Sequence, residues 1–275
     1  MSARKDGPGR AFERRPVLVT GAAAGRDWGI AVEIPVEIRL NGAPWTVMLA
    51  TPCDVEDLAV GLALTERVVT DARTIEAIDI ATWLGEVSVD LTVPAAHLRN
   101  PSRDGRSLAG NAGCGLCGLE SLTAFHLRQQ ETGGSGRSDQ VISDEAIVAA
   151  FTALPGQQPI NRQTRSVHAA AWCRPDGSIE DVREDVGRHN ALDKLVGARA
   201  RQHRLGRPGF IVMTSRCSYE LVSKAAAAGA SLLATISAPT TLALTWSQAL
   251  GIPLACCGPD RQVVRFPQEM AHVVG

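Results

Sequence analysis

Strands and helices alternate along the second half of the chain, and this pattern limits the fold more than any other feature of the sequence. Apolar residues there recur either in short runs of strand length or at helical spacing. The expected elements are a helix at 143–154, strands at 166–172 and 179–186, a helix at 190–202, a strand at 210–214, a helix at 219–228, a strand at 231–236, a helix at 242–250, and strands at 253–257 and 263–266. Alternation after a single hairpin predicts a mixed sheet with helices on both faces.

Polar residues gather directly after several of these strands, where sheets of this type bind ligands. The polar segments are 183–190, 215–218, 237–241 and 258–261. Arg188 and His189 open one predicted helix, and Arg216 and Ser218 precede the next. Helix N-termini offer free N–H groups, and arginine adds bidentate phosphate recognition. The sequence therefore predicts an anion site, suited to phosphates, at this edge of the sheet.

The same charged residues could instead have a purely structural role. Asp185, Arg188, Asp193 and Lys194 have the charges and spacing of surface ion pairs and helix caps, which are common and carry little information about function. His168, in a strand of Ala and Trp, fits a core histidine as well as a site residue.

The first half of the chain predicts a smaller α+β unit. Asn41-Gly42 joins alternating runs at 36–40 and 45–49, which is a strong hairpin signal, and Pro44 places the second strand at an edge. Asp54 is the expected cap of a helix with one apolar face, and two more strands are expected at 75–80 and 87–93. The residues of the apolar face are Val55, Leu58, Ala59 and Leu62.

The segment 17–25 resembles the strand and glycine-rich turn at the start of a dinucleotide-binding fold. Such a loop must lead into a helix whose N-terminus faces the pyrophosphate. Residues 33–40 alternate with strand period instead, so we do not expect a nucleotide in this loop.

Two cysteines separated by two residues lie in a glycine-rich run at 113–118, just before a predicted helix at 119–130. Glycines leave both sulfurs open to a partner, and a thiol at a helix start or in such a pair has a depressed pKa. The pair predicts reactive-thiol chemistry. A zinc site needs about four ligands, and no second pair with that spacing exists; a redox dithiol and structural cysteines also remain possible.

The composition limits the partners and the cellular compartment that we expect for the protein. The net charge is −1, and nothing in the charge pattern predicts a nucleic-acid partner. Seven cysteines in a chain without a secretory signal favour reduced thiols in the cytoplasm, and no apolar run is long enough to span a membrane. Cys53, Cys173 and Cys217 are expected to pack as small hydrophobes. Cys256 and Cys257 are adjacent on a strand and are expected to point to opposite faces.

Glycine, serine and charged residues mark the expected domain boundaries. We predict a disordered tail at 1–27, an N-terminal α+β domain at 28–130 that carries the cysteine loop, a linker at 131–142, and an α/β cofactor-binding domain at 143–275.

Four segments together resemble the formate dehydrogenase accessory sulfurtransferase family, FdhD. They are Thr-Pro-Cys-Asp-Val-Glu-Asp-Leu-Ala at 51–59, the cysteine pair at 114–118, His-Ala-Ala at 168–170, and the run Val-Arg-Glu-Asp-Val-Gly-Arg-His-Asn-Ala-Leu-Asp-Lys at 182–194. The resemblance extends from about residue 33 to residue 266.

This resemblance implies a cytoplasmic homodimer with an α/β fold, in which a cytidine-deaminase-like three-layer α/β/α C-terminal domain follows the smaller N-terminal one. It implies transfer of persulfide sulfur from a cysteine desulfurase to the molybdenum cofactor, in its bis-molybdopterin guanine dinucleotide form, for formate dehydrogenase. Cys114 corresponds to the persulfide carrier and Cys117 to the second cysteine, and no structural metal is implied. The family's cofactor-binding stretch corresponds to Cys256, Cys257, Gly258, Pro259, Asp260 and Arg261.

Two other classes of function remain alternatives. A cofactor-binding chaperone would carry the molybdenum cofactor without moving sulfur. A zinc or redox module would use the cysteine pair differently. A deaminase is disfavoured because the zinc signature of that class is missing, and Ala170 stands where its glutamate should be.

Overall fold

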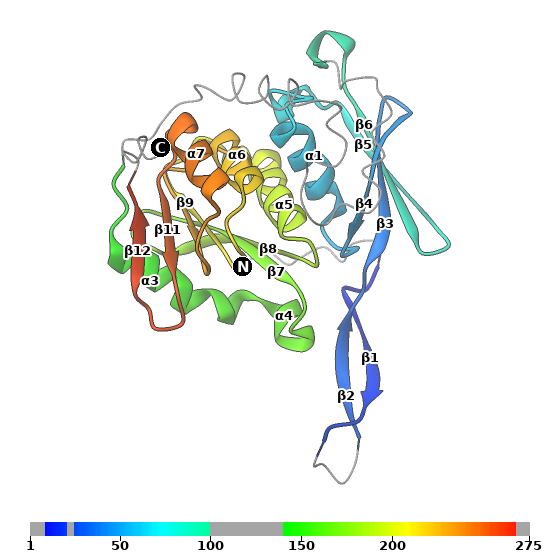
Figure 1. The fold of residues 1–275 in the computed structure, drawn as a ribbon. Helices are drawn as coiled ribbons and strands as arrows, with labels where there is room; N and C mark the ends of the chain where they lie inside the picture. Colours follow the sequence, from blue (N-terminus) through cyan, green and yellow to red (C-terminus); the bar gives the residue numbers. More distant parts are fainter. Residues whose placement is uncertain (1–8, 21–24, 100–139, 268–275) are drawn as a thin grey trace.

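The protein was analysed as a computed structural model, which describes residues 9–20, 25–99 and 140–267. Their strands form sheets of six, four and two strands. Figure 1 shows the six-stranded sheet between two layers of helices, with the four-stranded sheet beside it and the two-stranded sheet projecting as an arm.

The six-stranded sheet is mixed, as predicted. Its strands are β7 (His168–Cys173), β8 (Ile179–Asp185), β9 (Phe210–Met213), β10 (Leu233–Thr235), β11 (Leu254–Cys257) and β12 (Val263–Phe266), and their spatial order is β12-β11-β10-β9-β7-β8. β9, β10 and β11 are parallel, whereas β7 runs antiparallel to both β8 and β9. As a result β8, β9, β10 and β11 all end at the same edge. The likeness to cytidine deaminases stays a prediction.

Helices cover both faces of this sheet (Figure 1). α5 (Arg188–Arg201), α6 (Tyr219–Ala227) and α7 (Thr241–Leu250) lie on one face, while α3 (Asp144–Ala153) and the short α4 (Pro159–Thr164) lie on the other. Side chains alternate between the two cores as strand geometry requires. Trp172 and Met213 pack with α5 and α6, and Ala171 and Val212 pack with α3.

The four-stranded sheet has the order β4-β3-β6-β5 and packs against α1 (Val55–Thr65). Its strands are β3 (Ile34–Leu40), β4 (Ala43–Ala50), β5 (Ala77–Trp83) and β6 (Glu86–Thr92). The predicted hairpin is confirmed, because Asn41 and Gly42 both have positive φ, at 50° and 78°, as a type I′ turn requires. β4, which contains Pro44, lies at the sheet edge as expected.

The helix predicted after Asp54 is confirmed, and its predicted apolar face is buried. Asp54 precedes the helix in a left-handed conformation, but its side chain makes no capping hydrogen bond. The predicted side-chain cap is therefore wrong. The carboxylate lies 3.7 Å from Arg183 Nε, so the cation attracts it away from the helix N-terminus.

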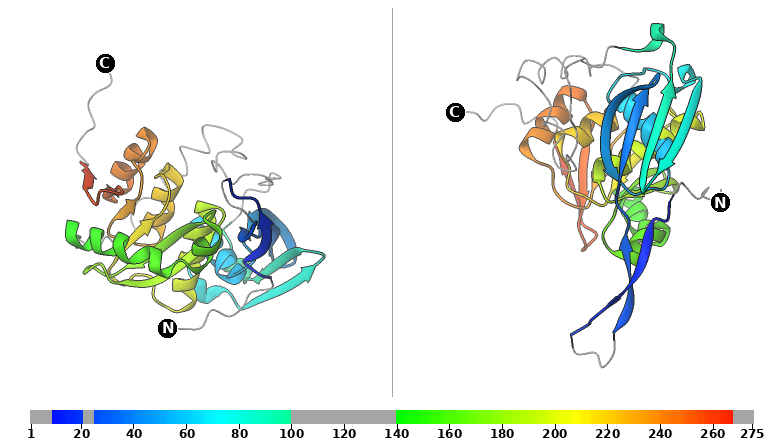
Figure 2. Two further views of the ribbon diagram at one scale, coloured as in Figure 1. Left: turned by 90° about the horizontal axis from the view of Figure 1, so that it is seen from below. Right: turned by 90° about the vertical axis from the view of Figure 1, so that its right-hand side faces the viewer.

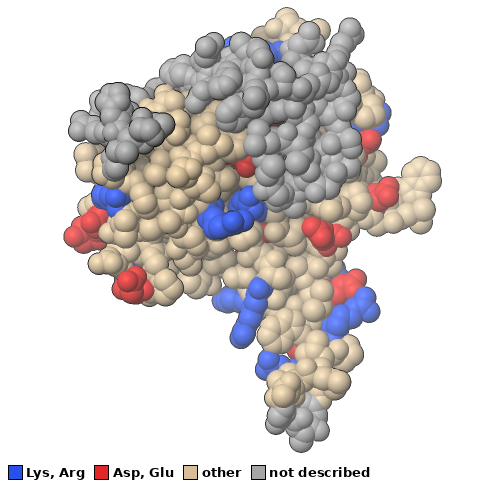
Figure 3. Space-filling view, in the orientation of Figure 1, with Lys and Arg blue, Asp and Glu red and all other residues tan. Residues whose placement is uncertain are grey.

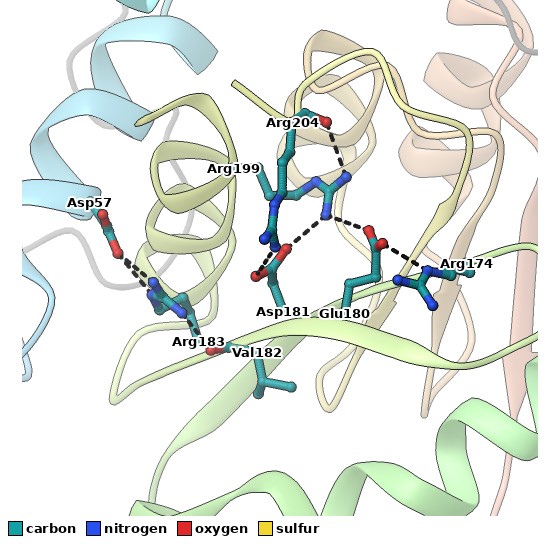
Figure 4. Close-up of polar contacts among 8 residues, drawn as sticks. All are labelled: Asp57, Arg174, Glu180, Asp181, Val182, Arg183, Arg199 and Arg204. Carbon is teal, nitrogen blue, oxygen red and sulfur yellow. Dashed lines mark hydrogen bonds and ion pairs between the residues drawn. The ribbon is translucent and has the colours of Figure 1, made fainter. Parts of the chain in front are cut away.

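Ion pairs join α1 to β8 and α5, on either side of the α1–α5 contact. Arg183 Nε donates to Asp57 Oδ2 at 2.9 Å, and Arg201 Nη1 donates to Asp57 Oδ1 at 2.6 Å. Figure 4 shows Arg183 reaching from β8 toward Asp57, and beside it the fully buried guanidinium of Arg199, which binds Glu180 and Asp181. The smaller sheet and its helix are thus fixed to the six-stranded sheet through charged side chains as well as apolar packing.

The arm contains β1 (Phe12–Val17) and β2 (Arg26–Ala31), which pair antiparallel and extend away from the body (Figures 1 and 2). The prediction of a disordered tail at 1–27 is wrong over β1 and the start of β2. The reason lies in Trp28 of β2, whose indole N–H donates to the Thr164 carbonyl of α4 and whose ring contacts Arg26 and Arg165. A two-stranded sheet is only marginally stable by itself. The contacts of Trp28 with α4 therefore stabilise β1 and β2.

The described part of the chain also contains three 3₁₀ turns, at Ala72–Thr74, Ala95–His97 and Leu154–Gln157. No helix within the described ranges has the length and apolar character needed to cross a bilayer. The boundaries predicted around 131–142 stay predictions, since most of that linker lies outside the described residues.

Candidate functional site

The polar segments predicted to meet at one sheet edge follow strands that end at that edge. The loops after β9 and β10 touch, because Thr240 N donates to the Cys217 carbonyl at 3.1 Å and Cys217 pairs with Pro239 as a short parallel bridge. β7 begins at the same edge, where His168 is the register partner of Asp185. In Figure 3, basic side chains lie near the centre of the visible face beside α5 and α6.

His189, Ser218 and Glu220 form a polar cluster at this edge. His189 Nε2 lies 3.0 Å from Glu220 Oε2 and 3.4 Å from Ser218 Oγ, and Ser218 Oγ donates to Glu220 Oε2 at 3.2 Å. His189 comes from the first turn of α5, and the other two come from the start of α6. The structure therefore brings together two predicted residues, His189 and Ser218, at neighbouring helix N-termini.

Sequence reasoning missed Glu220. Its side chain lies in the first turn of α6, where an acidic residue is ordinary and gives no functional signal. The informative observation is its burial, since its carboxylate is held against His189 rather than facing solvent. Only the tertiary structure shows this contact.

His168 is the first residue of β7 and is only partly buried. Its Nδ1 lies 3.2 Å from the Thr214 carbonyl, and Thr214 Oγ1 accepts the Ala169 N–H at 2.8 Å. Burial lowers the pKa of His168, and the nearby charges of Arg188 and His189 lower it further, against the hydrogen bond to Thr214. The ring is therefore expected to be neutral at pH 7, with Nδ1–H donating.

A buried ion pair supports the start of α5 from below. Lys194 Nζ lies 2.6 Å from Asp185 Oδ2, and both side chains are completely buried. The other carboxylate oxygen accepts from Gly187 N at 2.8 Å and from Asn190 Nδ2 at 3.0 Å. Burial alone would lower the pKa of Lys194, but the Asp185 charge outweighs it and the pKa is raised. Asp185 thereby fixes the turn that presents Arg188 and His189.

The same pair fastens the segment that follows β4. Asp185 Oδ2 accepts the Thr51 N–H at 3.0 Å, and Lys194 donates to the Thr51 carbonyl at 2.8 Å. Cys53, two residues further on, is half-buried. The prediction that Cys53 packs as a small hydrophobe stays a prediction.

The buried ion pairs show whether the charged residues of the 182–194 segment form surface ion pairs. Asp185, Asp193 and Lys194 are buried, with Asp193 bound to Lys224 Nζ at 2.9 Å and to Thr65 Oγ1 at 2.6 Å. The alternative of surface ion pairs is wrong for these three residues, because each is paired inside the protein. Arg188, by contrast, is half-buried, and Arg216 is exposed.

Cys173, Cys217, Cys256 and Cys257 are poor nucleophiles. Cys173 and Cys217 are buried as predicted, and burial raises the pKa of both thiols, that of Cys217 to about 12. Cys257 belongs to the core that contains α3, and strand alternation puts Cys256 on the other face, as predicted. Burial also raises the pKa of Cys256 and Cys257, so both favour the neutral thiol.

The predicted C-terminal stretch continues from β11 into an exposed turn. Gly258 accepts the Arg261 N–H at 3.1 Å, Asp260 Oδ1 accepts the Gln262 N–H at 3.2 Å, and Pro259, Asp260 and Arg261 are exposed. This turn lies at the same sheet edge as the His189 cluster, since β8 and β11 end there. No hydrogen bond or ion pair is found between the two groups among the residues described here.

Cys114 and Cys117 lie outside the described residues, so their predicted chemistry stays a prediction. Among residues 9–20, 25–99 and 140–267, no cluster of three His, Cys, Asp or Glu side chains could hold a metal ion.

The fold and the sheet edge define a mixed α/β protein in which two helix N-termini and their polar side chains meet where the strands end. The chain belongs to the FdhD/NarQ family, whose model matches residues 31–268.

Similar proteins include the sulfur carrier protein FdhD of Xanthomonas euvesicatoria pv. vesicatoria, which is 43% identical over 243 residues, covering 88% of this chain and 85% of the relative. The sulfur carrier protein FdhD of Cupriavidus necator is 44% identical over 245 residues, covering 88% and 84%. A crystal structure of a protein from Desulfotalea psychrophila, described as a formate dehydrogenase accessory protein, has the same fold. Its TM-score is 0.70 at 20% identity, covering 94% of this chain and 97% of that one.

Proposed function

We propose that this protein is a sulfurtransferase that accepts sulfur from the persulfide of a cysteine desulfurase and supplies it to the molybdenum cofactor for formate dehydrogenase. Support for sulfur transfer comes from the family and from the names of the similar proteins. The observation that carries the acceptor site is the meeting of the α5 and α6 N-termini, with His189 and Ser218, at one sheet edge.

In the first step, the Cys114 thiolate attacks the outer sulfur of the desulfurase persulfide. A sulfur–sulfur bond forms on Cys114, the bond within the donor persulfide breaks, and the desulfurase thiolate leaves with the electron pair. In the second step, Cys117 attacks the inner sulfur of the Cys114 persulfide. A Cys114–Cys117 disulfide forms and hydrosulfide leaves, so the two thiols supply both electrons.

The substrate that receives this sulfur is the bis-molybdopterin guanine dinucleotide form of the cofactor. Its phosphates suit the free N–H groups and positive dipole ends of α5 and α6, and arginine side chains add bidentate contacts. Arg188 stands at the start of α5 and exposed Arg216 precedes α6. The 258–261 turn, which follows a neighbouring strand at this edge, is proposed as a further contact for the dinucleotide.

The first test is sulfur loading. The full chain is incubated with a cysteine desulfurase and cysteine, and its peptides are weighed by mass spectrometry. We expect one added sulfur on the peptide that contains Cys114. Cys114→Ala should abolish the added mass and Cys256→Ala should leave it unchanged. Full loading of the Cys114→Ala protein would show that this residue is not the carrier.

The second test concerns the acceptor site. Guanosine diphosphate should bind more tightly than adenosine diphosphate, and Arg216→Ala should weaken binding of both through the lost phosphate contact. Arg207→Ala changes another exposed arginine outside this edge and serves as the control. Equal and weak binding of both nucleotides would remove the case for a guanine dinucleotide.

A cofactor chaperone without sulfur transfer is the alternative. It predicts that a protein with both Cys114→Ala and Cys117→Ala still supports formate dehydrogenase activity, whereas sulfur transfer predicts that activity is lost. The partners, a cysteine desulfurase and formate dehydrogenase, belong to the proposal, as do the homodimer and the cytoplasmic location.

A further inference from the structure

Basic side chains are concentrated on the arm and on α4, which holds it. The segments 9–33 and 159–166 together contain six arginines and three acidic residues, although the whole chain has a net charge of −1. All six arginines are exposed, and they are Arg10, Arg14, Arg15, Arg26, Arg162 and Arg165. Figure 3 shows basic side chains where the arm meets the body. The arm is therefore a positively charged projection on a chain whose other residues are acidic on balance.

Two of these arginines contact a single aromatic ring. The guanidinium carbons of Arg26 and Arg165 lie 4.8 Å and 5.1 Å from the centroid of the Trp28 ring. A contact of this kind orients a guanidinium and leaves its N–H groups able to donate. In the described part of the chain, no carboxylate forms an ion pair with Arg26 or Arg165. Trp28 thus holds two positive charges for which the described residues supply no counter-charge.

Arg165 occupies a backbone position where arginine is unusual. It follows α4 in the left-handed region, with a φ of 56°, where glycine or asparagine is most common. Its N–H donates to the Asn161 carbonyl at 2.8 Å, a bond that glycine would make equally well. The backbone therefore gives no reason for an arginine, and the contribution of this residue lies in its side chain beside Trp28.

An exposed apolar side chain lies next to this pair of charges. Arg26, Trp28 and Ile30 alternate along β2, so they lie on one face of the ribbon. Ile30 is 46% exposed. The contact with the Trp28 ring adds Arg165 to the group. We call these four residues, Arg26, Trp28, Ile30 and Arg165, the arm surface.

We propose that the arm surface binds an acidic segment of a partner protein, whose carboxylates pair with Arg26 and Arg165 and whose apolar side chains cover Ile30. Guanidinium groups bind carboxylates through two parallel hydrogen bonds. Arginine and tryptophan are also enriched where protein interfaces bind most strongly. Because the arm extends away from the body (Figure 1), a second protein can approach it without displacing a described helix or strand. This inference does not depend on sulfur transfer.

Nucleic acid and anionic lipid also carry negative charge, but the arm favours a polypeptide. Glu13 and Asp27 lie among its arginines, and Glu13 pairs with Arg15 at 2.5 Å. These carboxylates would repel a continuous row of phosphates, whereas a polypeptide can place its acidic residues only where the arginines are. Exposed Ile30 finds an apolar partner in a polypeptide but not along a phosphate backbone.

The test measures binding of a fluorescently labelled peptide to the full chain by anisotropy. The peptide contains glutamates and leucines, and a control peptide has glutamine in place of every glutamate. We expect only the acidic peptide to bind, with an affinity that falls as salt is added. Arg26→Ala and Arg165→Ala should each raise the dissociation constant about fivefold, and Arg26→Lys should raise it less because it keeps the charge. Arg207→Ala, which changes an exposed arginine outside the arm, should leave it unchanged.

Hydrogen exchange locates the bound peptide. The acidic peptide should slow exchange in β2 and leave β9 unchanged. Failure of the acidic peptide to bind at low salt would overturn the proposal, as would equal binding of the glutamine peptide or equal weakening by Arg207→Ala. Tighter binding of single-stranded oligodeoxythymidine or of phosphatidylserine vesicles would also overturn it. If Arg165→Ala releases the arm, as faster exchange in β1 would show, Arg26→Ala decides, and an unchanged dissociation constant would overturn the proposal.

Discussion

Gly61 of α1 and Gly197 of α5 face each other where the two helices cross. A Cβ atom on Gly61 would lie 1.8 Å from the Asp193 carbonyl oxygen, and one on Gly197 would lie 1.9 Å from the Asp57 carbonyl oxygen. Neither residue has positive φ, so the requirement for glycine is steric rather than conformational. This backbone contact brings Thr65 within reach of Asp193 and joins the two sheets.

We expect Gly61→Ala and Gly197→Ala each to lower the free energy of unfolding by about 1–3 kcal/mol or more, because backbone atoms cannot move aside as side chains do. Denaturant unfolding measures the change. Gly156→Ala is the matched control, since a Cβ atom there meets nothing within 4 Å. Its effect should be small. Equal stability of the Gly61→Ala protein would mean that the helices separate without cost.

The alternating elements of the second half could be predicted because their apolar periods are unambiguous. The strands at β9 and β11 and the helices α6 and α7 fall within two residues or so of the expected ranges. α4 was missed, since it has only six residues and begins at Pro159. β1 was missed because its stability comes from Trp28 and α4, which are distant contacts that a local pattern cannot show.

Part of the candidate site could be predicted for a similar reason. His189 and Ser218 follow strands that end at one edge, so topology alone places them together. The burial of Asp185 and Lys194 could not be predicted, because a charged pair has the same sequence whether it lies on a surface or inside. Their depth depends on the Thr51 segment, which is more than 130 residues away in the chain.

Breaking the Asp185–Lys194 pair should strongly destabilise the protein. We expect Asp185→Asn and Lys194→Met each to cost about 3–5 kcal/mol of unfolding free energy, since each leaves a buried charge without its partner. Combining both changes should cost less than the sum. Arg174→Ala removes a pair whose arginine is 61% exposed, and should change stability by no more than about 1 kcal/mol. If the double variant lost as much unfolding free energy as the two single variants together, Asp185 and Lys194 would not be energetically coupled.

Trp28→Ala should release the arm without unfolding the body. The substitution removes the hydrogen bond to Thr164 and the ring that contacts Arg26 and Arg165. Amides of β1 should then exchange with solvent much faster, while those of β9, in the buried sheet, keep their protection. Ile30→Ala, which shortens an exposed side chain on the same strand, should change exchange in the arm less. Slow exchange in β1 after Trp28→Ala would show that another contact holds the arm.

Acid should weaken the fold through His168. Burial lowers the pKa of this imidazole in the folded protein below its value of about 6.5 in an unfolded chain. The unfolded state therefore binds more protons between the two values, so this contribution to stability is complete above about pH 6.5 and is lost as the pH falls toward the folded pKa. Denaturant unfolding between about pH 7 and pH 5 measures the slope, which His168→Gln should reduce by up to one proton, because glutamine does not titrate. A slope that His168→Gln does not change would mean that other groups carry the acid sensitivity and that His168 already binds its proton in the folded protein.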